Sequence, residues 1–230
     1  MTTSGTYAFS PANADLVTYA FSLCGIRRTE ILQEHLVNAN MAMNVMLQAW
    51  GNETPNLWTV DEVVQTLVPG VRTYNVDPKT IMVLDAFVRW TNDSGSVADR
   101  IIWPVSRTEY ASYPNKGLEG APTTFWFDRQ LAPTITLWPV PNGEGVYELR
   151  YYRCVQIQDA AMSGAQTLDI PLLWMEAFAY GLASRMALIY MPDKHVMLDA
   201  LAERSWTRAA TQNVENVPLF IGPQLGGYYR

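Results

Sequence analysis

The two histidines are the residues best suited to acid–base or metal chemistry, because an imidazole can act as a base or bind zinc. His35 lies in the sequence EHLVN, which lacks the second histidine of the HExxH zinc motif. His195 follows Asp193 by two positions, near the expected start of the last helix. The pattern favours an ordinary structural role for both histidines, so we expect no catalytic residue, no metal site and no cofactor.

Paired carboxylates are the groups that a cell-wall hydrolase would need to cleave a glycosidic bond. Asp61 and Glu62 form an adjacent acidic pair at the expected start of a strand. Neighbouring residues of a strand point to opposite faces, so these two carboxylates are not expected to flank one bond. The motifs GxGxxG, GxxxxGKS/T and GxSxG are absent. We therefore expect the chain not to be an enzyme, and a cell-wall hydrolase stays an alternative.

Aromatic residues dominate the segment TTFWFDRQLAPTITLWPV, residues 123–140, which is expected to form a hairpin. Alternation along its first strand places Phe125 and Phe127 on one face and Trp126 on the other. In the second strand, Trp138 likewise lies opposite the aliphatic residues. Trp126 and Trp138 are therefore candidates for a subunit contact. A carbohydrate-binding module stays an alternative, because two such rings could also stack on a sugar.

Composition and charge limit the possible partners. The 230 residues include eight Trp and twelve Tyr, and aromatic residues are enriched in cores and in protein–protein contacts. The net charge of −6 argues against binding nucleic acid by charge attraction, because Lys and Arg supply that affinity. Such a chain could still surround DNA without holding it tightly.

Neither the cysteines nor the apolar segments indicate an exported or membrane protein. Cys24 and Cys154 form no CxxC motif and are expected to be small buried hydrophobic residues. No segment has the pattern of a signal peptide or of a membrane span. We expect a protein that is made in a cytoplasm and stays soluble or joins an assembly.

Helical patterns occur at both ends of the chain, where apolar residues recur every three or four positions. Thr29 is expected to cap the second helix and Asp169 the third, because these side chains accept the free N–H groups of a first turn. The third helix is apolar nearly all round and should be central. The last helix should direct Met197, Leu201 and Trp206 inward. The expected helices cover about residues 11–24, 29–50, 171–191 and 194–211.

Short apolar strands and turns fill the middle of the chain. Residues 63–68 and 71–76 are expected to form a hairpin around Pro69-Gly70. A short helix capped by Ser106 should precede the aromatic hairpin. Further strands are expected at residues 81–90, 97–105 and 146–157.

This order of elements predicts an α+β fold. The N- and C-terminal helix pairs are expected to form one four-helix bundle, with an antiparallel β-rich domain inserted between them. The last residues, NVENVPLFIGPQLGGYYR, have no hydrophobic period and are expected to be an extended C-terminal arm that needs a partner to order it. The expected units cover residues 1–54, 55–160, 161–211 and 212–230.

Five segments, in order along the chain, carry a resemblance to a known family: LVNANMAMNVMLQAW, VPGVRTYNV, SRTEYASYPNKGLEGAPTTFWFDRQ, ITLWPVPNGEGVYELRYYR and IPLLWMEAFAYGLASRMA. The chain resembles the head-to-tail adaptor proteins of short-tailed bacteriophages, which are the connector or tail tubular ring proteins attached below the portal. The order SRTEYASYPNK, FWFDRQ, LWPVP is the most specific part of the likeness, which covers about residues 11–220.

The resemblance implies a structural virion protein without catalytic residues. Twelve copies would form a homo-oligomeric ring between the portal protein and the tail nozzle protein, around the channel for the genomic DNA. The ring would lie in the neck of the virion after assembly in the host cytoplasm, with no membrane partner. In such proteins the C-terminal segment commonly docks onto the portal, and here ordering of the arm would be the switch. The portal-contact candidates are Pro218, Leu219, Phe220, Ile221, Tyr228 and Tyr229.

Overall fold

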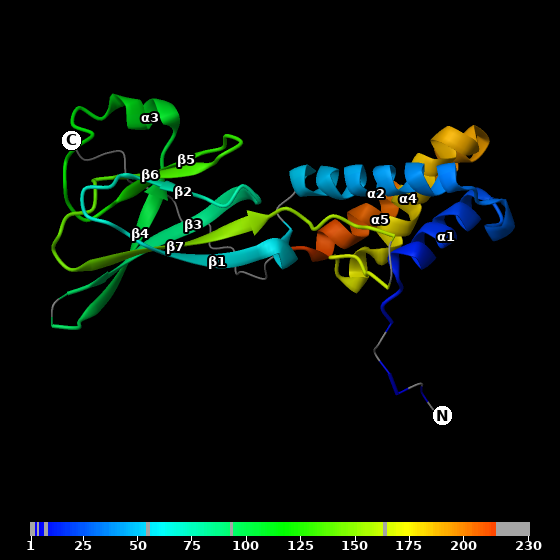
Figure 1. The fold of residues 1–230 in the computed structure, drawn as a ribbon, viewed down its shortest axis with the longest axis horizontal. Coiled ribbons are helices and arrows are strands. Elements are labelled where there is room, and N and C mark those ends of the chain that lie inside the picture. Colours follow the sequence, from blue (N-terminus) through cyan, green and yellow to red (C-terminus); the bar gives the residue numbers. More distant parts are fainter. Residues whose placement is uncertain are drawn as a thin grey trace, which may run out of the picture.

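The computed structural model describes residues 3, 5, 6, 9–53, 56–92, 94–162 and 165–214. The molecule is elongated, with helices at one end and a curled sheet at the other (Figure 1). The N-terminal helices lie beside the C-terminal helices, although the strands separate the two pairs in the sequence (Figure 1). The predicted α+β fold with a β-rich middle is therefore confirmed.

Helix α1, Asn13–Cys24, ends at the glycine that follows it. Gly25 has a φ of 88°, a left-handed conformation that glycine adopts without steric cost. Its N–H donates to the carbonyl oxygen of Ser22 at 3.0 Å, which satisfies one of the free carbonyls of the last turn.

Helix α2, Gln33–Glu53, begins later than predicted. Thr29 lies inside the 3-10 helix Arg28–Glu30, so the prediction that it caps α2 is wrong. Instead, Nδ1 of His35 accepts the backbone N–H of Leu32 at 2.8 Å. This contact gives His35 a structural role, because it satisfies a backbone donor at the start of the helix.

Helices α4, Met175–Tyr190, and α5, Pro192–Gln212, form the C-terminal pair. The prediction that Asp169 caps this region is wrong, because its carboxylate accepts the backbone N–H of Gln158 at 3.3 Å. The helical conformation begins instead with the 3-10 helix Leu172–Trp174, which leads directly into α4.

Helix α4 contacts α1, α2 and α5, which fits the central position predicted for it. Phe178, Leu182 and Met186 on α4 are completely buried in the shared hydrophobic core. The prediction that Met197 of α5 points inward is wrong. Its side chain is 57% exposed, and the next residue, Leu198, is buried instead. Small residues further along α5, Ser205 and Ala209, share the buried face, so α5 approaches α4 closely.

Seven strands of the described chain form one curled sheet in the order β1-β7-β3-β4-β5-β6-β2. Neighbouring strands pair antiparallel, except that β4 and β5 are parallel. The pairing of β3 with β4, and of β5 with β6, confirms the predicted neighbours. The strands are β1 Val60–Thr66, β2 Thr73–Asn75, β3 Thr80–Thr91, β4 Val97–Pro104, β5 Thr124–Asp128, β6 Thr134–Trp138 and β7 Val146–Val155.

The predicted hairpin of residues 63–68 and 71–76 is wrong. β1 pairs with β7 and β2 pairs with β6, at opposite ends of the strand order. A turn does occur at Gly70, which has a φ of 76°, but its N–H donates to the carbonyl oxygen of Pro141 at 2.9 Å. The chain therefore crosses from one edge of the sheet to the other at this turn.

The inner face of the sheet forms a second hydrophobic core. Phe125, Ile135 and Leu137 are buried there, as the alternation of the aromatic hairpin predicted. Leu149 and Tyr151 of β7 fill the same core, while Cys24 and Cys154, both free thiols, are buried as expected. Burial raises the pKa of both thiols, so they stay protonated and unreactive near neutral pH.

The segment Leu172–Tyr190 is long and apolar enough to cross a membrane, judged by length and composition alone. This finding differs from the expectation that no segment would have this pattern. Half of the apolar stretch is buried inside the protein, and the core helix of a soluble protein meets the same criteria. A single helix of this kind is weak evidence for a membrane span.

Candidate interaction surfaces

Helix α3, Arg107–Ser112, covers part of the outer face of β5 and β6. The hydroxyl of Ser106 accepts the backbone N–H of Glu109 at 3.1 Å, so the predicted cap is confirmed. The ring of Tyr110 stacks on the indole of Trp126, with a centroid distance of 5.5 Å and an angle of 27°. This predicted contact residue is therefore partly covered by its own chain.

The segment after α3 covers the second predicted contact residue in the same way. Tyr113 packs on Trp138 with a centroid distance of 4.3 Å, and the indole N–H donates to the carbonyl oxygen of Asn115 at 2.9 Å. Trp126 and Trp138 are both half-buried. Their role as subunit contacts stays a prediction.

A sugar-binding surface would need exposed aromatic ring faces, and here tyrosines occupy them. Lys116 holds these tyrosines in place, because its ammonium donates to the carbonyl oxygens of Ala111 and Tyr113 at 3.0 and 3.1 Å. The same ammonium lies 5.8 Å from the centre of the Tyr110 ring. This packing favours a structural role for the aromatic layer over stacking on a sugar.

The most exposed large hydrophobic side chains of the strands lie on the outer face of β4. Ile101 is 66% exposed and Trp103 is 67% exposed, whereas Ile102 between them points into the core. The strand register places Phe87 of β3 opposite Ile101. We name this surface the β3–β4 outer face, and it consists of Phe87, Arg89, Asp99, Ile101 and Trp103.

Ion pairs border the apolar part of this surface. Nε and Nη2 of Arg89 each donate to a carboxylate oxygen of Asp99 at 2.7 Å, which lowers the pKa of the Asp99 carboxyl below its usual value. On the same face of β7, Arg150 binds Glu148 at 2.9 Å and lies 3.6 Å from Glu62 of β1. An apolar centre with a charged border is the usual anatomy of a protein–protein interface.

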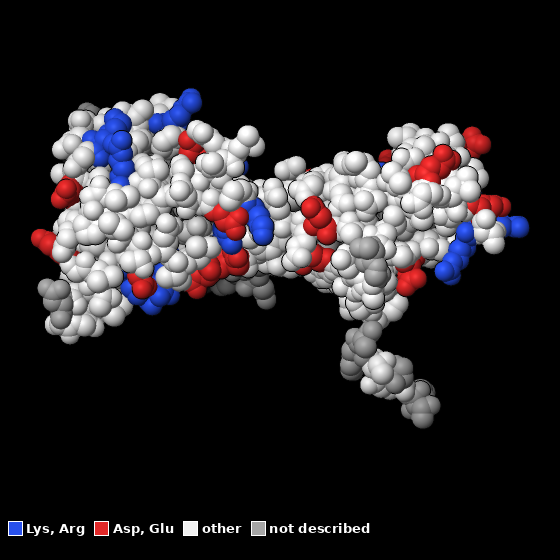
Figure 2. Space-filling view, in the orientation of Figure 1, with Lys and Arg blue, Asp and Glu red and all other residues white. Residues whose placement is uncertain are grey.

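Charge is mixed over the rest of the visible surface. Figure 2 shows acidic and basic side chains in small adjacent groups over the sheet and the helices, without a broad patch of one sign. The sequence as a whole carries a net charge of −6. Such a surface lacks the clustered positive charge that binds phosphate backbones.

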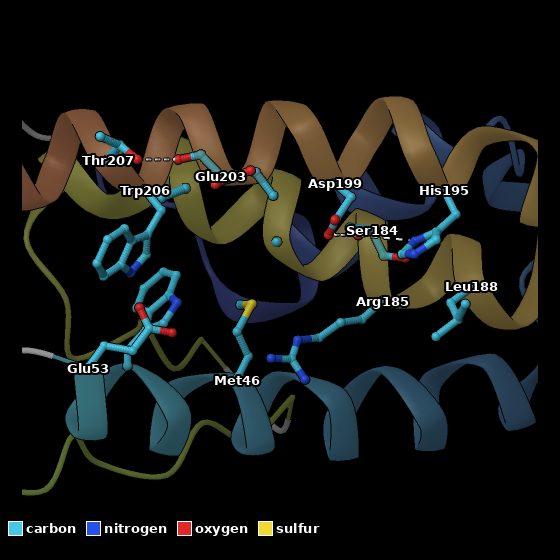
Figure 3. A pocket seen from close by; sticks show the side chains of 14 residues that line it. Met46, Glu53, Ser184, Arg185, Leu188, His195, Asp199, Glu203, Trp206 and Thr207 are labelled. Atoms are coloured by element: carbon cyan, nitrogen blue, oxygen red, sulfur yellow. Dashed lines mark hydrogen bonds between the residues drawn. The ribbon is translucent and has the colours of Figure 1, made fainter.

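A groove of about 500 Å³ lies between α2, α4 and α5 (Figure 3). We name it the α2–α4–α5 groove, and Met46 and Gly181 are among the residues that line it. Arg185 reaches from α4 into the groove, and within the described residues its guanidinium makes no hydrogen bond or ion pair. Trp206 lines the groove too, and its buried Nε1 has no acceptor among those residues.

Ser184, His195 and Asp199 meet at one wall of this groove (Figure 3). The hydroxyl of Ser184 donates to the carboxylate of Asp199 at 3.0 Å. Nδ1 of His195 lies 3.3 Å from the same hydroxyl and 3.2 Å from the backbone carbonyl oxygen of Ser184. A serine nucleophile needs its proton directed at the imidazole, with the carboxylate on the other ring nitrogen. Here the proton points to the carboxylate, so the contacts link α4 to α5.

The remaining expectations concern metals and the arm. The described part of the chain contains no group of three His, Cys, Asp or Glu side chains placed to hold a metal ion. All six portal-contact candidates, Pro218, Leu219, Phe220, Ile221, Tyr228 and Tyr229, lie outside the described residues.

Reasoning from the sequence missed Ile101 and Trp103 as candidates for an interaction surface. Their signal was the alternation in VADRIIWPV, which places both side chains on the same face of one strand. That alternation alone does not say which face is open, because the outcome depends on what packs against the sheet. The tertiary structure covers the aromatic hairpin and leaves the β3–β4 outer face exposed.

Exposed hydrophobic side chains on open faces, such as Ile101 and Trp103, are typical of a protein that binds other proteins. A family model supports this class and makes it specific. The model described as SU10 adaptor protein matches residues 13–217, and the chain belongs to this family. It is therefore an adaptor-type structural protein of a bacteriophage, which makes it a component of a virion. No curated protein matches the chain.

Proposed function

We propose that this protein is the head-to-tail adaptor of a short-tailed phage. Twelve copies form a ring in the virion neck, between the portal protein and the tail nozzle protein, after assembly in the host cytoplasm. The β3–β4 outer face carries this proposal, because Ile101 and Trp103 expose an apolar surface on an ordered strand. Large exposed apolar groups with a charged border mark sites that another protein covers.

Ring closure needs two different surfaces on each subunit, because neighbours in a head-to-tail ring meet by heterologous contacts. The β3–β4 outer face is one such surface. The helical half supplies the other in this proposal, with residues 1–54 and 161–211 acting as one four-helix bundle and residues 55–160 as the inserted domain. The shared hydrophobic core of α1, α2, α4 and α5 supports the bundle as a single rigid unit.

The charge distribution suits a ring that DNA passes through. A dense positive lining would hold the DNA backbone and slow its passage, whereas a net charge of −6 with mixed surface charge does not. Contact with DNA in this proposal is therefore transient and independent of sequence.

The C-terminal arm, residues 212–230, makes the portal contact in this proposal. Pro218, Leu219, Phe220 and Ile221 supply apolar anchors, followed by Tyr228 and Tyr229. An arm that orders only on the portal makes docking depend on portal assembly, because the ordering cost is recovered only there.

Electron microscopy of the chain mixed with the portal of its own phage tests this function. The expected result is a ring of extra density below the portal, with the symmetry of twelve subunits. A chain that stays monomeric and leaves the portal bare would contradict the proposal. Deletion of residues 213–230 should abolish docking, and unchanged portal affinity would refute the role of the arm.

A further inference from the structure

Strand β4 has an unpaired edge along its first five residues, 97–101. β5 pairs with β4 only beyond this stretch, from Trp103 onward. There, the N–H of Trp103 donates toward β5, to the carbonyl oxygen of Thr123 at 3.0 Å. Backbone groups two residues apart in a strand point to the same side, so the N–H groups of Asp99 and Ile101 point out from this edge. Neither N–H has an acceptor among the described residues.

A pocket of about 270 Å³ lies beside this edge, and Ala98 and Arg100 of β4 are part of its lining. The rest of the lining is apolar or aromatic and includes Val88, Trp90 and Tyr147. The guanidinium of Arg100 has no carboxylate partner within the described part of the chain. A strand added along β4 would pair the free N–H groups and would place alternate side chains next to this pocket.

Strand β1 is the terminal strand of the same sheet, and its outer edge is free too. β1 pairs with β7 alone. Leu67, directly after β1, donates its N–H to the carbonyl oxygen of Tyr147 on β7 at 2.8 Å. The alternation therefore directs the N–H groups of Glu62, Val64 and Thr66 away from β7. These three residues are exposed, and their N–H groups have no acceptor in the described chain.

The charges of the two edges are complementary. β1 carries two carboxylates, Asp61 and Glu62, and no basic residue. The arginines of β7 that contact them each contact a second carboxylate as well, so acidic groups are in excess there. On β4, Arg89 neutralises Asp99, and the charge of Arg100 is left without a partner. Centred pairing of two β4 edges would instead set two copies of Asp99 opposite each other, which is unfavourable.

We propose that the open edge of β4 in one copy pairs antiparallel with the free edge of β1 in the next copy, so that the sheet continues from subunit to subunit. The two edges are different surfaces, so the contact is heterologous and repeats from copy to copy, as closure of a ring requires. The proposal rests on the proposed adaptor ring and deepens it, because it adds main-chain hydrogen bonds to the contacts made by the outer faces.

One register suits both edges. It sets Asp99 of β4 opposite Val64 of β1, so that the five open residues of β4 overlap the last five residues of β1. A shift by two residues in one direction sets Glu62 against Asp99, which are like charges. The same shift in the other direction carries the overlap past the end of β1. In the favoured register Arg100 lies diagonally from Asp61, within reach of a long side chain.

Disulfide formation between two variants of the full-length chain tests this contact. Ala98→Cys in one variant and Gln65→Cys in the other form a non-hydrogen-bonded pair in this register, with Cα atoms about 4.5 Å apart, which suits a disulfide. Leu131→Cys, at a completely exposed residue, replaces Gln65→Cys in the control. Cys24 and Cys154 are buried and do not compete. Under mild oxidation, on the portal and in concentrated free protein, we expect about tenfold more mixed disulfide than in the control.

A proline substitution shows whether the backbone edge itself makes the contact. Val64→Pro, added to the Gln65→Cys variant, removes an outward N–H and leaves the pairing with β7 in place, so the mixed disulfide should fall to the control level. Val64→Ser also removes the apolar side chain but keeps the N–H, so the disulfide should persist. Thr66→Pro replaces Val64→Pro if circular dichroism shows that the latter unfolds. Equal yields from the proline and serine variants overturn the strand pairing.

Failure of this contact is distinct from failure of the adaptor function. If electron microscopy shows rings on the portal while the mixed disulfide stays at the control level, the edge contact is overturned and the adaptor function stands. A disulfide that joins two Ala98→Cys copies in preference to the mixed one also overturns it, because that result pairs β4 with β4. If rings do not form, the concentrated free protein decides: a yield above the control supports the contact, and a yield at the control level overturns it.

Discussion

Trp138 donates its indole N–H to the backbone carbonyl oxygen of Asn115 at 2.9 Å, and the two residues are separated by 23 positions in the sequence. Tyr113 packs on the same indole with a centroid distance of 4.3 Å. Strand β6 thereby holds the segment that follows α3 on the outer face of the sheet. A residue that was predicted to face a neighbouring subunit is part of the support for α3.

Replacement of Trp138 tests that support. Trp138→Phe keeps an aromatic ring but removes the indole donor, so we expect the free energy of unfolding to fall by about 1–2 kcal/mol. Urea denaturation followed by circular dichroism measures the change. Trp126→Phe is the matched control, because the Trp126 N–H makes no hydrogen bond within the described residues. Equal losses in the two variants would show that the hydrogen bond to Asn115 contributes nothing.

The β3–β4 outer face should matter for assembly and not for folding. The double variant Ile101→Ser with Trp103→Ser changes two side chains that are mostly exposed, so the free energy of unfolding should stay within about 0.5 kcal/mol. Ring formation on the portal should be lost, as seen by electron microscopy and sedimentation velocity. Leu131→Ser is the control, at a completely exposed leucine outside this face. If the double variant still forms normal rings, the β3–β4 outer face is not part of the subunit interface.

The position of Leu182 predicts a large effect on stability. This side chain is completely buried between α4 and its neighbours, so Leu182→Ala should lower the free energy of unfolding by about 2–5 kcal/mol. Leu173→Ala removes the same atoms at a residue that is 62% exposed, and it should change stability by less than about 0.5 kcal/mol. Thermal and urea denaturation measure both. Similar losses in the two variants would contradict the central position of α4.

The ion pair of Arg89 and Asp99 predicts a dependence of stability on pH. The hydrogen bond from Arg89 lowers the pKa of the Asp99 carboxyl below its usual 3.8. The pair's contribution is therefore complete above pH 3.8, the value in the unfolded chain, and is lost as the pH falls through the folded pKa. The difference in unfolding free energy between the wild type and Asp99→Asn should be constant near neutral pH and shrink below about pH 4.

Urea denaturation across this pH range checks the ion pair, and Arg89→Gln provides the reciprocal test. Removing the guanidinium should abolish the same pH-dependent contribution, because Arg89 is the main cause of the lowered pKa. The effect should be small and should weaken at high salt, since both side chains are partly exposed. If the difference in unfolding free energy between the wild type and Asp99→Asn persists unchanged at low pH, it comes from packing and not from the ion pair.

Local signals predicted the parts of the fold that depend on nearby residues. Gly25 ends α1 and Ser106 caps α3, because a cap is decided within one helical turn. Alternation assigned Phe125 and Leu137 to the core, since the two-residue period of a strand is also local.

Two predictions of local contacts failed because a more distant partner competed with the nearby one. Residues 63–68 and 71–76 have the pattern of a hairpin, but both strands pair with segments about sixty or more positions away, as in the register of Thr73 with Thr136. Asp169 has the chemistry of a helix cap, yet its carboxylate binds the N–H of Gln158. In both cases a long-range contact replaced the local one that the pattern indicated.

By itself the sequence determined the α+β class, the order of the main elements and the buried face of the aromatic hairpin. Only the tertiary structure decided which outward faces are covered: α3 and its following segment lie over Trp126 and Trp138, whereas Ile101 and Trp103 stay open. The physical reason is that polarity and periodicity are properties of neighbouring residues. Exposure depends on which distant segment packs against a face, and that depends on the sum of contacts made by the whole chain.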